Sequence, residues 1–272
     1  MRASWRGYDP VTAMIVDPNE TVESYCRDWD GRAPYARATI VHTEGLTAAK
    51  AGAKAVVTSG GELIGWIGGG CIRGAVMRAA RQAMETAVPR LIRVRPREEI
   101  IAERDPDGVE LHASGCPSKG RAEIFIEPVM PKPPLVIIGH GQIARSLAEL
   151  AASLHVDVVV IDGKTENAAL SDIQGHPGLE RGFIVIATQG AGDFQALKSA
   201  LQSAVPYVAF VASRAKAKAL RERLAAEGVP ESSLDRLRAP AGIDIRAKTA
   251  AEIAISILAE IISVRRTADA AA

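Results

Sequence analysis

The sequence predicts an α/β protein of two domains, an N-terminal α+β domain followed by a domain built on a parallel sheet. Three observations predict this fold class. The chain of 272 residues exceeds the length at which one core usually suffices. Its second half alternates strand-like with helix-like segments, whereas strand-like segments dominate the first half. Four prolines between residues 127 and 136 predict a stiff connector, so we assign the domains to residues 1–130 and 131–272.

The composition and charge of the chain argue against several classes of function. The net charge is +1 and the Lys and Arg residues are scattered, which argues against a nucleic-acid partner. No apolar run approaches the ~18 residues of a membrane span, and the apolar stretch 11–16 is too short for a signal-peptide core. Three widely spaced cysteines suit a reducing compartment better than a disulfide framework or a zinc site. We therefore expect a cytoplasmic protein without a membrane span or metal ligands.

In the N-terminal half, one helical pattern stands among several strand patterns. Residues 71–87 have the apolar spacing of a helix. The turn signal Ser59-Gly60-Gly61-Glu62 joins two strand-like segments into a hairpin. The predicted strands are residues 37–43, 53–59, 63–69, 90–94 and 121–128.

In the C-terminal half, short continuous apolar runs suit strands that are buried on both faces of a parallel sheet. The predicted strands are residues 135–139, 156–162, 183–188 and 207–213, and the predicted helices are residues 142–154, 193–204 and 214–228. A capping box, Thr249-x-x-Glu252, opens a final helix that should pack on the domain rather than span a membrane. Its expected apolar face consists of Ile253, Ile257, Leu258, Ile261 and Ile262.

A GxGxxA pattern follows the strand at 135–139 and opens a helix, which predicts a Rossmann-like domain. Gly139 permits the tight turn, Gly141 lets the backbone approach a pyrophosphate, and Ala144 allows close helix–strand packing. Asp162 ends the next strand, where it can accept hydrogen bonds from a ribose diol. A nucleotide is therefore a candidate ligand, although a Rossmann-like scaffold with an empty crevice needs the same glycines.

The loop Thr188-Gln189-Gly190 follows another strand at its carboxyl end, the edge where open α/β sheets bind ligands, so we expect it to line the site. These features suggest a nucleotide- or NAD(P)-dependent oxidoreductase as one alternative function. Such an enzyme needs a proton donor beside the hydride acceptor, and no Ser/Tyr/Lys or His/Asp set stands out.

Three glycines, Gly68, Gly69 and Gly70, precede Cys71 at the start of the helix 71–87. Successive backbone N–H groups there can cradle an anion, and a helix N-terminus favours the thiolate form of a cysteine. Arg73 adds positive charge in the first turn. These features suit a ligand that carries phosphate, sulfur or a metal, whereas the competing interpretation makes Cys71 a small core residue.

Five segments carry a more specific pattern: residues 51–57, 61–73, 115–128, 238–245 and 250–265. Together they resemble the XdhC/CoxI family, accessory proteins of xanthine dehydrogenase and its relatives. The resemblance runs from about residue 36 to residue 266. Residues 188–193 are similar to the CoxF-like branch, which is linked to the copper-containing carbon monoxide dehydrogenase.

The resemblance implies a maturation factor rather than a turnover enzyme. Family members bind the molybdenum cofactor, of molybdopterin type, hold it while a sulfurase adds a sulfido ligand, and pass it to an apoenzyme. The implied partners are an apo molybdenum hydroxylase, a cysteine desulfurase and a second copy of the chain in a homodimer. Lys54, Cys71 and Cys116 match positions of the family pattern.

Three residues depart from the family pattern. Arg73 stands where relatives usually carry an acid, Lys119 where many have glycine, and Gln142 where many have histidine. We expect Arg73 and Lys119 to favour an anionic ligand. A further alternative function is soft-metal delivery, because Cys71 and Cys116 would suit Cu(I) if folding brings them together. The expected binding residues are Lys54, Gly68, Gly69, Gly70, Cys71, Arg73, Cys116, Gly139, Gly141, Gln142, Asp162, Thr188, Gln189 and Gly190.

Overall fold

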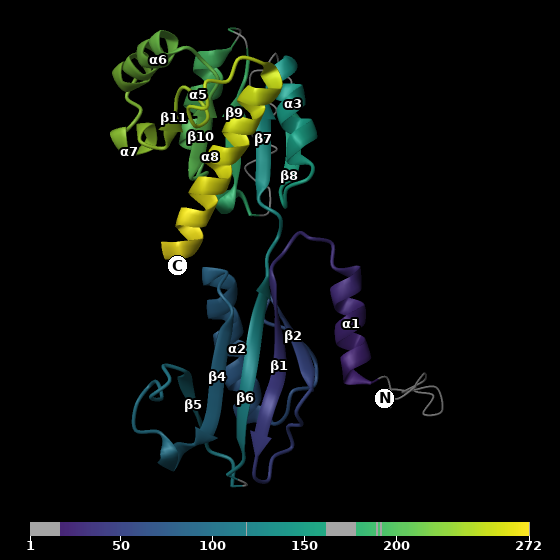
Figure 1. Cartoon of the computed structure of the whole chain (residues 1–272). Coiled ribbons are helices and arrows are strands. Elements are labelled where there is room, and N and C mark those ends of the chain that lie inside the picture. The colour runs from purple at the N-terminus through teal and green to yellow at the C-terminus, as the bar shows by residue number, and fades with distance from the viewer. Residues whose placement is uncertain (1–16, 118, 162–177, 189, 191, 272) are drawn as a thin grey trace, which may run out of the picture. The chain divides into compact units, whose positions relative to one another are not determined.

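The chain divides into two compact units, unit 1 (Met1–Met130) and unit 2 (Pro131–Ala272), shown in Figure 1. The computed structural model describes residues 17–117, 119–161, 178–188, 190 and 192–271. Among these residues, no helix combines the length and the apolar composition needed to cross a membrane.

Unit 1 is built on a six-stranded sheet with the strand order β3-β2-β1-β6-β4-β5. Neighbouring strands are antiparallel except for β4 and β5, which are parallel. The strands are β1 (Tyr35–Glu44), β2 (Lys54–Thr58), β3 (Leu63–Gly65), β4 (Arg90–Pro96), β5 (Glu110–Ser114) and β6 (Arg121–Val129). The helices are α1 (Pro18–Asp28), α2 (Gly70–Thr86) and the short 3-10 helix η1 (Arg97–Glu99).

Three details of unit 1 differ from the sequence-based expectation. The prediction of a strand over 63–69 is wrong in its second part, because β3 ends at Gly65, where φ is +90° and a Cβ would lie 2.6 Å from Val22 Cγ2. The prediction also missed α1, although Asp17, Pro18 and Glu20 form a helix-start signal; its only buried side chain is Val22. The five-residue strand β5 was missed because it is short and polar.

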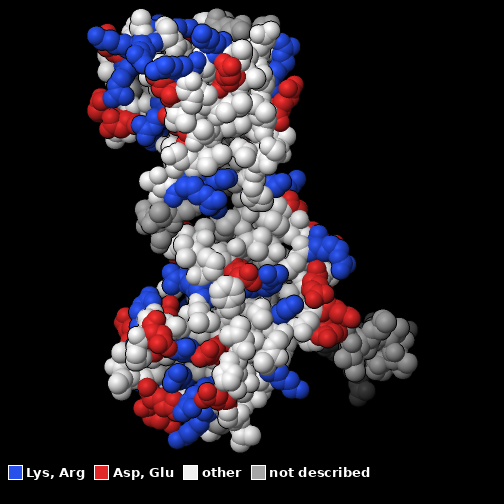
Figure 2. All heavy atoms as spheres, in the orientation of Figure 1, with Lys and Arg blue, Asp and Glu red and all other residues white. Residues whose placement is uncertain are grey.

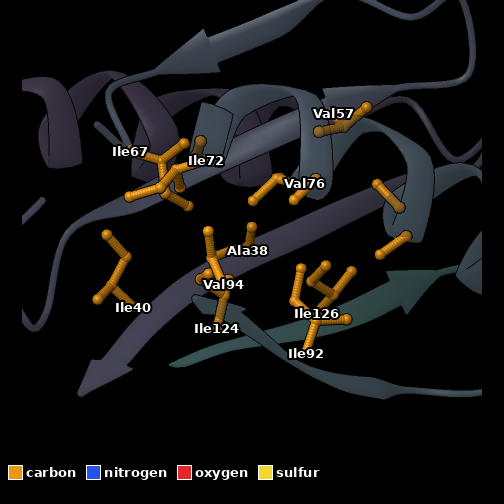
Figure 3. Close-up of a cluster of buried hydrophobic side chains, with 14 of the residues drawn as sticks. Ala38, Ile40, Val57, Ile67, Ile72, Val76, Ile92, Val94, Ile124 and Ile126 are labelled. Carbon is orange, nitrogen blue, oxygen red and sulfur yellow. The ribbon is translucent and has the colours of Figure 1, made fainter. Parts of the chain in front are cut away.

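The core of unit 1 lies between α2 and one face of the sheet. Buried residues of α2 recur at helical spacing, which directs one stripe toward the sheet; they are Ile72, Ala75, Val76, Ala79, Ala80 and Ala83. The alanines let the helix lie close to the strands. Figure 3 shows Ile72 and Val76 of α2 with Ala38, Ile124 and Ile126 of the sheet. Full burial of each isoleucine contributes about 1.5–3 kcal/mol.

The opposite face of the sheet is partly covered by α1 and otherwise carries ion pairs. Val22 of α1 packs against Tyr35 and Val56, whose side chains point away from α2. Farther along this face, Arg93 Nε donates to Glu123 Oε1 at 2.8 Å, and similar pairs link neighbouring strands. Figure 2 shows basic and acidic side chains interspersed over this part of unit 1 rather than gathered by sign.

Unit 2 confirms the predicted Rossmann-like parallel sheet. Its strands are β7 (Pro134–Ile138), β8 (Asp157–Ile161), β9 (Phe183–Ile186), β10 (Tyr207–Phe210) and β11 (Leu237–Arg238). They are all parallel in the order β11-β10-β9-β7-β8. The strand order reverses between β7 and β9, which is the topological switch point of a doubly wound sheet.

Helices cover both faces of the sheet of unit 2. The helices are α3 (Gln142–Ala151), α5 (Asp193–Gln202), α6 (Arg214–Ala226), α7 (Glu231–Leu234), α8 (Ala250–Ala271) and the 3-10 helix η2 (Leu179–Arg181). Leu135 and Ile137 of β7 pack with α3 and α8, whereas Val136 and Ile138 pack with α5, α6 and α7. Because β7 is buried on both faces, its sequence is a continuous apolar run.

The predicted capping box of α8 is present. Glu252 N donates to Thr249 Oγ1 at 3.3 Å, and Thr249 N donates to Glu252 Oε2 at 2.9 Å. The helix packs on the sheet through Ile257, Leu258 and Ile261, as expected. Ile262 is a correction, because it is 36% exposed and lies at the margin of the apolar face.

Candidate functional site

Both cysteine loops lie at one edge of the sheet of unit 1. The strands β1, β3, β4 and β5 end at this edge, and the antiparallel strands β2 and β6 begin there. Segments 45–53, 66–69 and 115–120 are the connections that result, and together we call them the loop edge. Cys71 lies just after the segment 66–69, and Cys116 lies within 115–120.

The glycine run forms the N-terminus of α2. Gly68 has φ +110°, and a Cβ there would lie 3.2 Å from Ala49 Cβ, so both conformation and space favour glycine. Gly69 is the N-cap residue, and no side chain caps the helix. A Cβ on Gly69 or Gly70 would meet nothing within 4 Å. These two glycines are not required by crowding, and their absence of side chains leaves the backbone accessible.

The first turn of α2 offers unpaired donors. Within the described residues, the amides of Gly70, Cys71 and Ile72 have no acceptor, and the first helical bond runs from Arg73 N to Gly69 O at 3.0 Å. The side chains of Cys71 and Arg73 are exposed, and the first turn contains no acidic residue. Free amides, the helix dipole and a guanidinium together make a site for an anion.

The second cysteine loop is held by contacts of its ends. The Cys116 amide donates to the Oγ of buried Ser114 at 3.2 Å, and the Cys116 side chain is exposed. Lys119 has φ +51°, and its Nζ lies 2.7 Å from Glu98 Oε1. This exposed ion pair places a carboxylate beside the Lys119 charge, and the preference of Lys119 for an anionic ligand stays a prediction.

The segment 45–50 contacts both cysteine loops. Leu46 pairs with Lys119 in an isolated β-bridge, and a Cβ on Gly120 would lie 2.5 Å from Leu46 O. Three residues later, Ala49 packs against Gly68. Consecutive Cα atoms are about 3.8 Å apart, so a short stretch of chain joins the two loops. Folding thus brings the Cys71 and Cys116 loops to one edge although 45 positions separate the two cysteines.

An ion-pair network lies beside the second loop. Arg121, at the start of β6, lies 2.8 Å from both Glu44 Oε2 and Glu99 Oε1. The Arg121 guanidinium lowers the pKa of Glu44, with a smaller contribution from His42, and it also lowers the pKa of Glu99. These carboxylates therefore stay ionised and neutralise Arg121, so the network adds little net attraction for an anion.

Lys54 lies at the start of β2 and faces α1. Its amide donates to Asn19 Oδ1 at 3.0 Å, and its ammonium lies 3.7 Å from Glu23 Oε1. The side chain remains 35% exposed. These contacts give Lys54 a structural role in joining α1 to the sheet, beside the binding role that the sequence predicts.

The GxGxxA turn of unit 2 has the geometry that the motif predicts. Gly139 has φ +133°, and a Cβ there would lie 2.3 Å from Ala187 O, so the end of β9 lies directly against the turn. Gly141 is the N-cap of α3, which has no side-chain cap, and Gln142 is exposed at its first position. Ala144 is 1% exposed and packs in the core, as expected. Asp162 and Gln189 lie outside the described residues.

The loop after β9 is tied to a buried carboxylate that sequence reasoning did not assign. Asp193, at the start of α5, is 5% exposed and accepts hydrogen bonds from Thr188 Oγ1 and from Gly190 N. The Lys216 ammonium lies against its other oxygen as an ion pair, and it sits 5.5 Å from the centre of the Phe210 ring. The Thr188 hydroxyl is therefore occupied as a hydrogen-bond donor to Asp193.

A pocket of about 550 Å³ lies at the carboxyl edge of the same sheet, after β10 and β11. Ser213 and Arg214 line one side, and Gly242, Asp244 and Arg246 line the other. A Cβ on Gly242 would lie 2.3 Å from Ser256 Oγ, so the loop sits tightly on α8. Several residues that line this pocket belong to segment 238–245 of the family pattern. The sequence analysis assigned no ligand to any of them.

No group of three or more His, Cys, Asp or Glu side chains is arranged to hold a metal ion within the part of the chain that the structure describes.

Comparison with known proteins identifies the family. Residues 29–95 match the XdhC and CoxI family, and residues 135–261 match the XdhC Rossmann domain. The chain is 32% identical over 254 residues to the uncharacterized protein YqeB of Escherichia coli strain K12, an alignment that covers 86% of this chain and 44% of YqeB. The chain thus spans less than half the length of that relative.

A crystal structure of a xanthine dehydrogenase from Bacillus halodurans is 19% identical, with a TM-score of 0.39 and coverage of 92% of this chain and 96% of that chain. Such a similarity carries no inference about function. The two family matches cover well over half of the sequence, and one lies in each unit. The chain belongs to the XdhC and CoxI family.

Proposed function

We propose that the chain is a maturation factor that binds the molybdenum cofactor and assists its modification and insertion into a molybdenum hydroxylase. The enzyme served would be of the xanthine dehydrogenase or carbon monoxide dehydrogenase type. In this role the chain is a carrier, and its chemistry is binding and release rather than turnover. Membership of the XdhC and CoxI family supports the maturation role.

One observation carries the proposal: an exposed Cys71 stands on a helix N-terminus whose first amides are unpaired. Molybdopterin supplies a phosphate and a metal bound through sulfur. Backbone donors at a helix N-terminus suit the phosphate, and a thiol suits a soft metal. The open space at Gly69 and Gly70 leaves these groups within reach of a ligand. The residues present therefore fit the cofactor.

The second cysteine loop extends the site. Cys116 is exposed at the loop edge, where the segment 45–50 holds its loop beside the first one. We propose that this loop forms the other wall of the cofactor site. A sulfurase and the apoenzyme would then approach the cofactor at the exposed loop edge, and a second copy of the chain would complete a homodimer.

The proposal is tested by expressing the chain in a host that makes molybdopterin. We expect the purified protein to retain a fluorescent pterin and to accelerate activation of an apo molybdenum hydroxylase. The variant Cys71→Ala should lose most of the pterin. Cys26→Ala is the matched control and should retain the pterin. Cys26 lies in α1 and packs beside Tyr35 of β1, away from the loop edge. Wild-type protein without pterin or effect on activation would refute the proposal.

A nucleotide bound by unit 2 is a second candidate function, favoured by the contact of Gly139 with the end of β9 at the switch point. We propose that NAD(P) or another nucleotide binds there, with or without redox turnover. Dinucleotide at ~100 times its dissociation constant should stabilise the protein by roughly 2.7 kcal/mol. Unchanged thermal unfolding at millimolar nucleotide would count against this role.

A further inference from the structure

A pocket of about 580 Å³ adjoins the loop edge in unit 1. It is lined by Asp17, Pro18 and Asn19 at the start of α1, by residues 50–53, and by Trp66. Trp66 stands two positions before Gly68, and Ala49, which packs against Gly68, directly precedes the pocket residue Lys50. The pocket therefore borders the glycine run of the proposed cofactor site, and its size suits a small heterocyclic ligand.

Trp66 differs from the tryptophan that stabilises the fold. The Trp29 indole N–H donates to Ala33 O at 2.8 Å, and its ring meets Tyr35 edge to face at 5.3 Å. Trp66 is 43% exposed and has neither a hydrogen-bond acceptor nor an aromatic neighbour among the described residues. An indole face of this kind is a stacking surface for a flat ring.

The polar groups of the pocket have unused binding capacity. Asp17 Oδ1 accepts from Asn19 N at 2.9 Å as the N-cap of α1, and Oδ2 has no partner in the described part of the chain. Lys50 is exposed and forms no ion pair with a described residue. A free carboxylate oxygen can accept N–H bonds from a ring edge, and an ammonium can donate to a ring carbonyl.

We propose that this pocket binds the 2-amino-4-oxo ring system of a pterin, which stacks on Trp66 and presents its amino edge to Asp17. The inference rests on the proposed function and deepens it, because it assigns the organic ring to this pocket and the phosphate and metal to the neighbouring glycine run. Guanine has the same 2-amino-4-oxo edge on a different bicycle, so the experiment compares both.

Binding of 6-hydroxymethylpterin to the full-length chain tests the assignment, because this probe lacks phosphate and metal. Guanosine and lumazine are the comparison ligands, and lumazine replaces the 2-amino group with a carbonyl. We expect the pterin to bind more tightly than either. Trp66→Leu should weaken pterin binding about 5- to 150-fold, the effect of losing one stack, and Trp66→Phe should restore most of it.

Asp17→Asn removes the carboxylate and keeps a good N-cap residue, so α1 should remain folded. This variant should weaken pterin binding about tenfold or more and should no longer favour pterin over lumazine. Ile101→Ala is the matched control, because Ile101 is 97% exposed and does not line the pocket. It should bind pterin as the wild type does.

The outcomes separate this inference from the proposed function. If the wild type retains the molybdenum cofactor from the host but Trp66→Leu and Asp17→Asn retain equal amounts, the ring lies elsewhere and only the inference fails. The same conclusion follows if the wild type binds no 6-hydroxymethylpterin, or if guanosine binds more tightly. If the wild type retains no cofactor at all, the proposed function fails.

Discussion

The substitution Gly139→Ala tests the geometry of the Rossmann turn most directly. A Cβ at this position would lie 2.3 Å from Ala187 O and 2.7 Å from Ala187 C, and φ is +133°. The conformation alone costs a residue with a Cβ about 1–3 kcal/mol. Forcing the backbone of β9 away adds about 1–3 kcal/mol, as for other overpacked sites. We therefore expect a total loss of about 2–6 kcal/mol, a large share of a typical stability of about 5–15 kcal/mol.

Gly228→Ala is the matched control in the same unit. Gly228 also has a positive φ, +82°, but a Cβ there would meet nothing within 4 Å, so this variant carries the conformational cost without the overlap. It should lose only about 1 kcal/mol. The excess loss of Gly139→Ala over Gly228→Ala reports the contact with the end of β9 together with the more strained backbone at φ +133°.

The assay is urea unfolding followed by two signals. All three tryptophans, Trp5, Trp29 and Trp66, belong to unit 1, so their fluorescence reports that unit, whereas far-ultraviolet circular dichroism reports both. Gly139→Ala should lower the dichroism midpoint by about 1–3 M urea at an m-value of about 2 kcal/mol/M. The fluorescence transition should stay in place. A loss no larger than that of Gly228→Ala would mean that the contact with β9 does not contribute to stability.

Three further predictions concern other contacts. Tyr207→Phe removes the hydrogen bond from the buried hydroxyl to Glu260 Oε2 and should cost unit 2 about 1 kcal/mol in urea unfolding; no change would deny the bond a role. Thr249→Ala removes the N-cap of α8 and should cost about 1 kcal/mol, while Thr249→Ser should restore stability if capping is the cause. Burial lowers the pKa of His112 below its ordinary 6.5; Glu110 opposes this shift and Arg78 adds to it, and the net lowering favours the neutral ring in the fold. The stability that the neutral ring confers is complete above pH 6.5 and is lost as the pH falls through the folded-state pKa. In urea titrations between pH 7.5 and 5, His112→Gln should therefore reduce the dependence of the unfolding free energy on pH. An unchanged pH profile would contradict this.

Local sequence patterns were enough to predict the architecture of unit 2 and most of the strands of unit 1. Apolar runs such as residues 135–138 report burial on both faces, and the helical stripe from Ile72 to Ala83 reports one covered face. These signals are local, because the period of side-chain directions is fixed by the backbone of each element. The need for glycine at position 139 could also be predicted, because the position has a positive φ and leaves no room for a Cβ. The family pattern was readable for the same reason, as it consists of short contiguous segments.

Which of these segments come into contact could be seen only in the folded structure. The two cysteine loops share an edge because Leu46 and Ala49 contact one loop each, and no local pattern encodes that pairing. The ion pair of Glu98 with Lys119 and the contacts of Asp193 with Thr188 and Lys216 are likewise visible only in the folded structure. Contacts between residues far apart in the chain depend on how whole elements pack. The identity of a charged residue in the sequence does not show whether its side chain is paired, buried or accessible to a ligand.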